Sequence, residues 1–173
     1  MPCRRSGGLD QAAPELLADQ GERMTYTETE AQTDGERRAA NQAILEHVFT
    51  HLRELGDGPE SDVAEFFARE TLFESPYRNV RLIGVDQVHR ALRQVADQFT
   101  TMKHTAMAFT PGASPDDFVW EAAAEATFRS TGEAYPQQYV VFCRMKLGKI
   151  LTLRQYYNTR TYHLSNDGAP AFV

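Results

Sequence analysis

One histidine has a sequence setting in which it could carry out acid–base chemistry. His104 lies in an alternating segment, residues 102–109, that predicts a β-strand. Imidazole is the side chain that titrates closest to neutral pH, so His104 is a candidate general acid or base. The alternative is a histidine at a strand edge that hydrogen-bonds only to backbone or water. We predict a catalytic role for His104.

A second candidate group surrounds Pro76. Glu74 and Tyr77 flank this proline, which ends a short predicted strand at residues 71–77. In an apolar cavity the pKa of Glu74 would be raised, and its carboxyl group could then transfer a proton. The alternative is a surface glutamate paired with Arg78 or Arg81. We predict Glu74 as a catalytic residue and Tyr77 as a substrate contact at the pocket mouth.

No other set of residues indicates a metal or a cofactor. His47 and His51 are four residues apart on a predicted helix, but no glutamate completes an HExxH pattern. Cys143 alternates with Val141 on a predicted buried strand and is expected to be a core residue. The sequence contains no phosphate-binding loop, dinucleotide fingerprint or Ser/His/Asp set. We therefore expect neither a metal nor a cofactor.

Composition limits the partners of the chain. The 173 residues are 42% hydrophobic and 24% charged, with a formal net charge of -6, which suits one globular domain. An acidic chain lacks the basic face that nucleic acid or an anionic membrane requires, and no apolar run is long enough to span a membrane. Because Cys3 lies in a polar segment, no structural disulfide is expected. We predict a cytoplasmic protein with a small-molecule ligand.

The apolar pattern places a single folded domain at residues 35–162. Residues 1–34 and 163–173 show no sustained apolar period and are predicted to be tails. Met24 is an alternative candidate for the natural start. The expected helices are 36–55, 61–67 and 85–99, and the expected strands are 71–77, 102–109, 118–129, 138–146 and 150–158. Helices followed by an antiparallel meander predict an α+β domain, with helices on one face of a curved antiparallel sheet.

The strand predicted at 118–129 has one apolar face with small residues at its centre. The residues on this face are Phe118, Trp120, Ala122, Ala124, Ala126 and Phe128. The three alanines fill little volume, so a cavity could form over them. The alternative is that bulky helix residues pack directly onto the alanines.

Two stretches resemble the SnoaL-like proteins of the NTF2-like superfamily. Residues 72–88 carry LFESPY and GVDQV, similar to the strand, proline and helix start of that superfamily. Residues 139–158 carry YVVF, GKI and LRQYYN, similar to its closing hairpin. The resemblance spans about residues 36–160. It implies a cystatin-like cone of three N-terminal helices on a curved antiparallel sheet, enclosing one apolar pocket.

Within the superfamily the chain most resembles the phenazine-biosynthesis A/B proteins (PhzA/PhzB), through ERRAAN at 36–41 and GEAYPQQY at 132–139. These proteins are dimers that bind aromatic acids and assist an imine-forming condensation. Their substrate tyrosine falls on Tyr135. Their strand glutamate falls on Gln155, and their helical histidine and serine fall on Ala91 and Val95.

The resemblance also covers the ketosteroid isomerases, whose general-base aspartate falls on Ser75. The pocket is therefore expected to be retained while the best-known catalytic groups are replaced. Tyr135 and Gln155 are the residues implied to act on the substrate with His104 and Glu74. The residues expected to contact the substrate are Ser75, Tyr77, Ala91, Val95, Trp120 and Tyr139.

The first hypothesis for function is a cofactor-independent tailoring enzyme of bacterial specialised metabolism. It would isomerise, cyclise, dehydrate or condense a small apolar or aromatic substrate by acid–base catalysis. One alternative is a non-catalytic binding protein that holds such a molecule. Another is a dimeric assembly module. In each case a homodimer is expected through the outer face of the sheet, where Val140 and Phe142 alternate with the inward-facing residues.

Overall fold

A computed structural model of the protein describes residues 32–158. Most of both predicted tails, with Cys3 and Met24, lies outside the described residues. Helix α1 (Asp34–Thr50) begins just before the domain boundary predicted at residue 35. A capping box explains this start: Thr33 Oγ1 accepts from the Glu36 backbone N–H at 3.2 Å, and Glu36 Oε2 accepts from the Thr33 backbone N–H at 2.8 Å.

The helix predicted at 36–55 is two helices in the structure. Helix α1 ends at a turn in which His51 has φ −115° and ψ 26°, and α2 (Leu52–Asp57) follows immediately. Gly56, one residue beyond the predicted end of this helix, lies buried within α2, where it packs against α4. The short helix α3 (Glu60–Phe66) is close to its predicted bounds of 61–67.

The sheet has six strands in the order β2-β1-β6-β5-β4-β3. Strand β1 (Phe67–Ser75) leads through a 3-10 turn (Pro76–Arg78) into β2 (Val80–Ile83), which four residues were too few to predict. Helix α4 (Val85–Gln98) then precedes the other strands. These are β3 (Phe99–Pro111), β4 (Asp117–Phe128), β5 (Ala134–Lys146) and β6 (Lys149–Tyr157).

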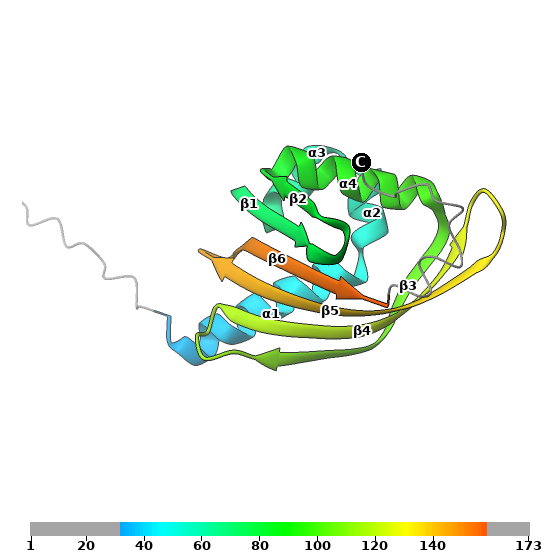
Figure 1. Ribbon diagram of the computed structural model, residues 1–173. Helices are drawn as coiled ribbons and strands as arrows, with labels where there is room; N and C mark the ends of the chain where they lie inside the picture. The colour runs from blue at the N-terminus through cyan, green and yellow to red at the C-terminus, as the bar shows by residue number, and fades with distance from the viewer. Residues whose placement is uncertain (1–31, 159–173) are drawn as a thin grey trace, which may run out of the picture. The chain divides into compact units, whose positions relative to one another are not determined.

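The predicted α+β class is confirmed, and Figure 1 shows the helices on one face of a curved sheet. Two details of the prediction were wrong. The sheet is mixed, because β6 lies beside β1 and runs parallel to it, whereas all other neighbouring strands are antiparallel. The α-helices within 32–158 number four, since the first predicted helix is divided. Hydropathy alone does not reveal that β1 and β6, far apart in sequence, pair as neighbours.

The main core lies between the helices and the inner face of the sheet. Leu45 and Val48 of α1, Val63 of α3 and Ile150 of β6 are completely buried. Phe49 of α1 stacks on Trp120 of β4, with ring centroids 3.8 Å apart. This contact fixes the helix over the centre of the sheet, because aromatic pairs bury a large apolar area in a specific geometry.

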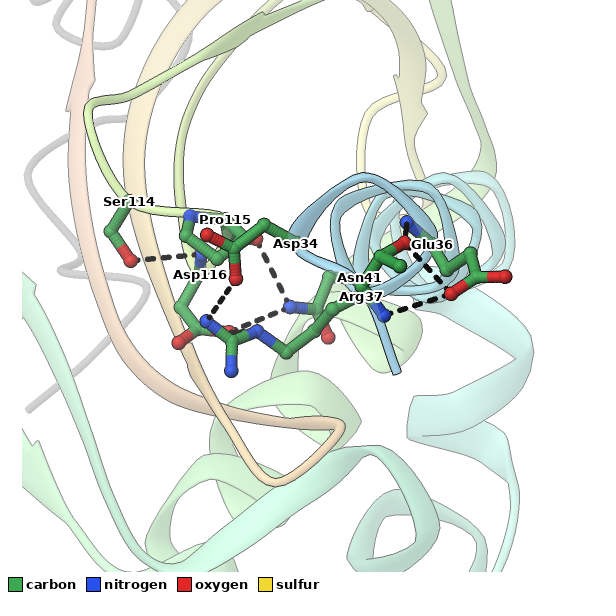
Figure 2. Close-up of polar contacts among 8 residues, drawn as sticks. Asp34, Glu36, Arg37, Asn41, Ser114, Pro115 and Asp116 are labelled. Atoms are coloured by element: carbon green, nitrogen blue, oxygen red, sulfur yellow. Dashed lines mark hydrogen bonds and ion pairs between the residues drawn. The ribbon is translucent and has the colours of Figure 1, made fainter. Parts of the chain in front are cut away.

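Polar contacts tie the start of α1 to the turn between β3 and β4, as Figure 2 shows. The buried Asn41 side chain donates from Nδ2 to Pro115 O at 3.2 Å and to Asp116 Oδ1 at 2.9 Å. Arg37 forms ion pairs with Asp116 at 3.4 Å and Asp34 at 3.3 Å. A buried amide that satisfies a turn in this way fixes the position of the helix along the sheet.

Candidate functional site

A cavity of about 130 Å³ lies between α4, β1 and the inner face of the sheet. Its wall is mainly apolar, with side chains from α1, α2, α4, the turn after β1 and all six strands. The side chains with polar atoms that line it are Ser75, Arg78, Gln98, His104, Trp120, Tyr135, Tyr139, Gln155 and Tyr157. Of the ten residues predicted for the site, eight line this cavity; Glu74 and Tyr77 do not.

Strand register explains why these residues meet. Trp120 pairs with Val141, and Val141 pairs with Gln155, so one transverse row crosses β4, β5 and β6. The next row towards the end of β6 holds Tyr139 and Tyr157. Successive inward positions on a strand are two residues apart, so these rows stack along the inner face. Residues far apart in sequence thus converge on one cavity.

The central alanines of β4 do not line the cavity, although all three are buried. The rings of His104 and Tyr139 lie near that part of the sheet, with centroids 5.9 Å apart, and Trp120 is 5.0 Å from His104. Contrary to the expectation, the cavity therefore does not form directly over the alanines. Aromatic side chains from the neighbouring strands occupy that space, and the cavity lies beyond them.

His104 on β3 is held in one orientation. Its Nδ1 lies 2.8 Å from the backbone oxygen of Phe49. Because a carbonyl oxygen only accepts, Nδ1 carries the proton, and in the neutral ring Nε2 is left as an acceptor or base. Burial lowers the pKa of His104 below its ordinary value of 6.5, and the bond to Phe49 opposes this in part. The ring is therefore neutral at pH 7.

The tyrosines form a connected network with Gln137. The Gln137 Nε2 atom donates to Tyr135 Oη at 2.9 Å and to Asn158 O at 3.0 Å, while its Oε1 accepts from the backbone N–H groups of Gln138 and Asn158. These bonds fix the amide orientation, so Tyr135 Oη is an acceptor from Gln137. The pKa of Tyr139 is raised well above 10, chiefly because its hydroxyl group is buried. The charges of Tyr135 and Tyr157 and a hydrogen bond with Tyr135 raise it further.

Glu74 and Tyr77 lie elsewhere. Glu74 faces away from the cavity and binds Arg154 at 2.9 Å, with Arg81 at 3.9 Å on its other oxygen. The predicted position of Glu74 at the pocket mouth was therefore wrong, and the alternative, a glutamate paired with Arg81, agrees with the structure. The alternating direction of side chains along β1 places Ser75 inward and Glu74 outward. Tyr77 is 51% exposed, and its ring contacts the edge of Tyr157.

The other titratable side chains take part in packing or in hydrogen bonds between elements. His47 and His51 stack on each other with centroids 4.5 Å apart, and no cluster of metal-ligating residues occurs within 32–158. The buried His89 bonds from Nε2 to Gly58 O at 3.0 Å and so links α4 to the end of α2. Burial raises the pKa of Cys143 to about 12, so its thiol is protonated and unreactive at neutral pH.

Sequence reasoning missed four polar or flexible residues of the cavity wall: Arg78, Gln98, Met102 and Tyr157. Arg78 follows Pro76 in the turn after β1, and its cavity position depends on that turn. Tyr157 could have been found, since it shares the inward parity of Gln155 on β6. Met102 could also have been found, since it shares the parity of His104 on β3. Gln98 ends α4, where helical periodicity gives no clear direction.

Comparisons with known proteins show the fold. Neither a family model nor a curated protein matches the sequence. Among solved structures, a phenazine biosynthesis-related protein from Pseudomonas aeruginosa is 13% identical with a TM-score of 0.64, covering 79% of this chain and 97% of that one. A SnoaL-like polyketide cyclase from Jannaschia sp. CCS1 is 14% identical with a TM-score of 0.64, covering 76% and 94%.

An isomerase from Bacillus subtilis is 18% identical with a TM-score of 0.65, covering 77% of this chain and 96% of that one. This chain therefore has the NTF2-like, SnoaL-like fold, as the sequence resemblance implied. At these identities the comparisons establish the fold alone. None of the helices among residues 32–158 is long and apolar enough to cross a membrane.

Proposed function

We propose that the protein is a cofactor-independent tailoring enzyme that transfers a proton on a small apolar or aromatic substrate bound in the cavity. The reaction would be an isomerisation, cyclisation, dehydration or condensation, in the setting of bacterial specialised metabolism that the SnoaL-like resemblance implies. The structural neighbours named as a polyketide cyclase and an isomerase are consistent with such chemistry.

The observation that carries the proposal is the state of His104. A neutral imidazole that donates from Nδ1 to Phe49 O has a basic Nε2, and His104 lines an otherwise apolar cavity. Its lowered pKa keeps it unprotonated at neutral pH, which is the form that a general base requires. Once protonated by the substrate, the buried imidazolium would readily return its proton to the product.

Tyr135 is the proposed partner of His104. Its oxygen accepts a hydrogen bond from Gln137, and Tyr135 lines the cavity. An accepted bond polarises a hydroxyl group and makes it a stronger donor. Such a donor stabilises charge that develops on a carbonyl oxygen when the neighbouring carbon loses a proton.

The test uses a general proton-transfer probe. In D₂O, the protein should accelerate exchange of the methyl-ketone protons of 4-methoxyacetophenone, followed by ¹H NMR. His104→Asn keeps a side-chain donor for Phe49 O but has no base, so exchange should slow about 10²-fold or more. Tyr135→Phe should slow it by a factor of roughly 2 to 12, the equivalent of one hydrogen bond. Exposed His47→Asn is the matched control and should leave the rate unchanged.

A non-catalytic binding protein is the second candidate, and one observation favours it. No carboxylate among residues 32–158 lines the cavity, and Gln155 and Ser75 stand where the resembling enzymes carry acidic groups. This candidate predicts that the probe binds in the cavity while exchange stays at the rate in buffer. Exchange equal to buffer in the wild type, with the probe bound, would therefore exclude the proton-transfer proposal.

A further inference from the structure

One transverse row of the inner face carries polar groups without a hydrogen-bond partner in the described part of the chain. The row runs Trp120, Val141 and Gln155 across β4, β5 and β6. Glu74 pairs in parallel with Arg154, so Ser75 follows beside Gln155 at the next position. All four residues of this row line the cavity. We call Trp120, Val141, Gln155 and Ser75 the recognition row.

Three of these side chains have no hydrogen-bond partner among residues 32–158. Trp120 Nε1 and Ser75 Oγ are buried without one, and the residues themselves are only 1% and 3% exposed. The Gln155 amide forms no bond to a described residue either. Leaving a buried polar group unsatisfied costs about 1–3 kcal/mol, so the two buried groups of Trp120 and Ser75 in one row need an explanation.

Several other polar groups of the cavity wall are engaged. His104 Nδ1 is bound to Phe49 O, Tyr135 to Gln137, and Tyr139 to Tyr135. The buried unpaired groups of Trp120 and Ser75 both lie in the recognition row. The ends of the row, Trp120 and Ser75, are separated by three strand spacings, about 14 Å between backbones. A ligand lying along the row would meet an unsatisfied group at each end.

We propose that the recognition row binds an uncharged, single-ring carbonyl compound that carries a hydrogen-bond acceptor at each of two opposite ends. The indole N–H of Trp120 can only donate, so it requires an acceptor, and a carbonyl oxygen is the strongest uncharged one. Ser75 and Gln155 bind the acceptor at the other end, and Val141 supports the ring. This proposal rests on the proposed function, in that the cavity is the ligand site.

Size and charge support this ligand class. An apolar cavity of about 150 Å³ accommodates benzene, so about 130 Å³ limits the ligand to a single ring. The recognition row contains no ionisable side chain, and burying an unpaired charge beside it would cost far more than burying a neutral carbonyl group. A fused polycyclic ligand would require the cavity to enlarge.

The test compares two molecules of similar shape. 4-Methoxyacetophenone has an acceptor at each end, and 4-ethyl-α-methylstyrene replaces both oxygens by carbon groups. Their dissociation constants are measured by ligand-observed NMR titration, and 4-methoxybenzoate is included as the anionic form. The wild type should prefer the ketone over the hydrocarbon, and should bind the anion more weakly than the ketone.

The variants remove one donor at a time. Trp120→Phe and Ser75→Ala should each reduce the ketone-to-hydrocarbon preference by roughly 3- to 10-fold, the equivalent of one hydrogen bond. Using the ratio cancels any change in cavity size. Thr71→Val is the matched control, because Thr71 Oγ1 is also buried and unpaired on β1 but does not line the cavity. It should leave the preference unchanged.

A second readout is stability without ligand. Ser75→Ala and Thr71→Val each remove an unsatisfied buried hydroxyl, so both should raise the melting temperature, while only Ser75→Ala lowers the preference. Equal ketone-to-hydrocarbon ratios in wild type and both row variants would overturn the proposal, as would tighter binding of the anion. If the hydrocarbon binds as tightly as the ketone, the proposal for the recognition row is wrong, but the cavity is still a ligand site. If no probe binds, the ligand-site premise fails too.

Discussion

At the scale of single residues, burial decides which groups can work chemically. His104 and Cys143 are both largely buried, yet burial makes one useful and the other inert. For the imidazole, burial lowers the pKa and favours the neutral base. For the thiol, burial raises the pKa to about 12 and removes the thiolate nucleophile. The same desolvation thus has opposite consequences for a cationic acid and a neutral acid.

The lowered pKa of His104 predicts a pH dependence of stability. The unfolded chain, with an ordinary histidine pKa near 6.5, binds this proton more readily than the folded protein does. The contribution of His104 is therefore complete above about pH 6.5 and is lost as pH falls through the folded pKa, with a slope of at most about 1.4 kcal/mol per pH unit.

Urea unfolding of the wild type and His104→Asn between pH 7.5 and 5 measures this effect. The free energy of unfolding should fall more steeply with decreasing pH in the wild type than in the variant, because only the wild type carries the titrating group. Identical pH slopes in the two proteins would show that His104 does not have a lowered pKa in the folded state.

At the scale of elements, the close approach of α2 and α4 positions the cavity wall. Gly56 allows this approach, since a Cβ atom there would overlap the backbone carbonyl oxygen of Leu92. Leu92 and its neighbours Ala91 and Val95 line the cavity from α4. Any outward movement of α4 would therefore change the shape of the ligand site as well as the packing of the helices.

Gly56→Ala should accordingly destabilise the protein by about 1–3 kcal/mol, the usual cost of overpacking, and weaken binding of 4-methoxyacetophenone. Gly35→Ala in the first turn of α1 is the control, because its added Cβ would meet only Thr33 Oγ1 at 4.0 Å. Thermal unfolding and a probe titration measure both effects. A Gly56→Ala protein as stable as Gly35→Ala would contradict the packing argument.

At the scale of the whole molecule, the outer face of the sheet carries exposed apolar groups. Phe142 is 49% exposed and Tyr156 is 41% exposed, and their rings meet edge to face with centroids 6.0 Å apart. Val140, opposite Tyr156 in the register, is half-buried beside them. An apolar patch on a sheet face is the type of surface through which identical chains associate.

We therefore predict a homodimer through this outer face. Sedimentation at micromolar concentration should give a dimer for the wild type and a monomer for Phe142→Arg, because a charge would be buried without a partner at the interface. Leu147→Arg is the control, since Leu147 is 92% exposed but lies in the β5–β6 turn, away from the patch. A monomeric wild type would count against the prediction.

The sequence by itself determined the α+β class, most of the elements and which face of each strand turns inward. It did so because periods of 3.6 and 2 residues are local properties, and the inward direction of Trp120 on the strand predicted at 118–129 follows from them. The places of Tyr135 and Gln155 were implied by the family resemblance. Only the tertiary structure decided the parallel pairing of β1 with β6, the outward direction of Glu74 and the burial that leaves His104 neutral. These depend on strand register and burial between distant segments, which local periodicity does not encode.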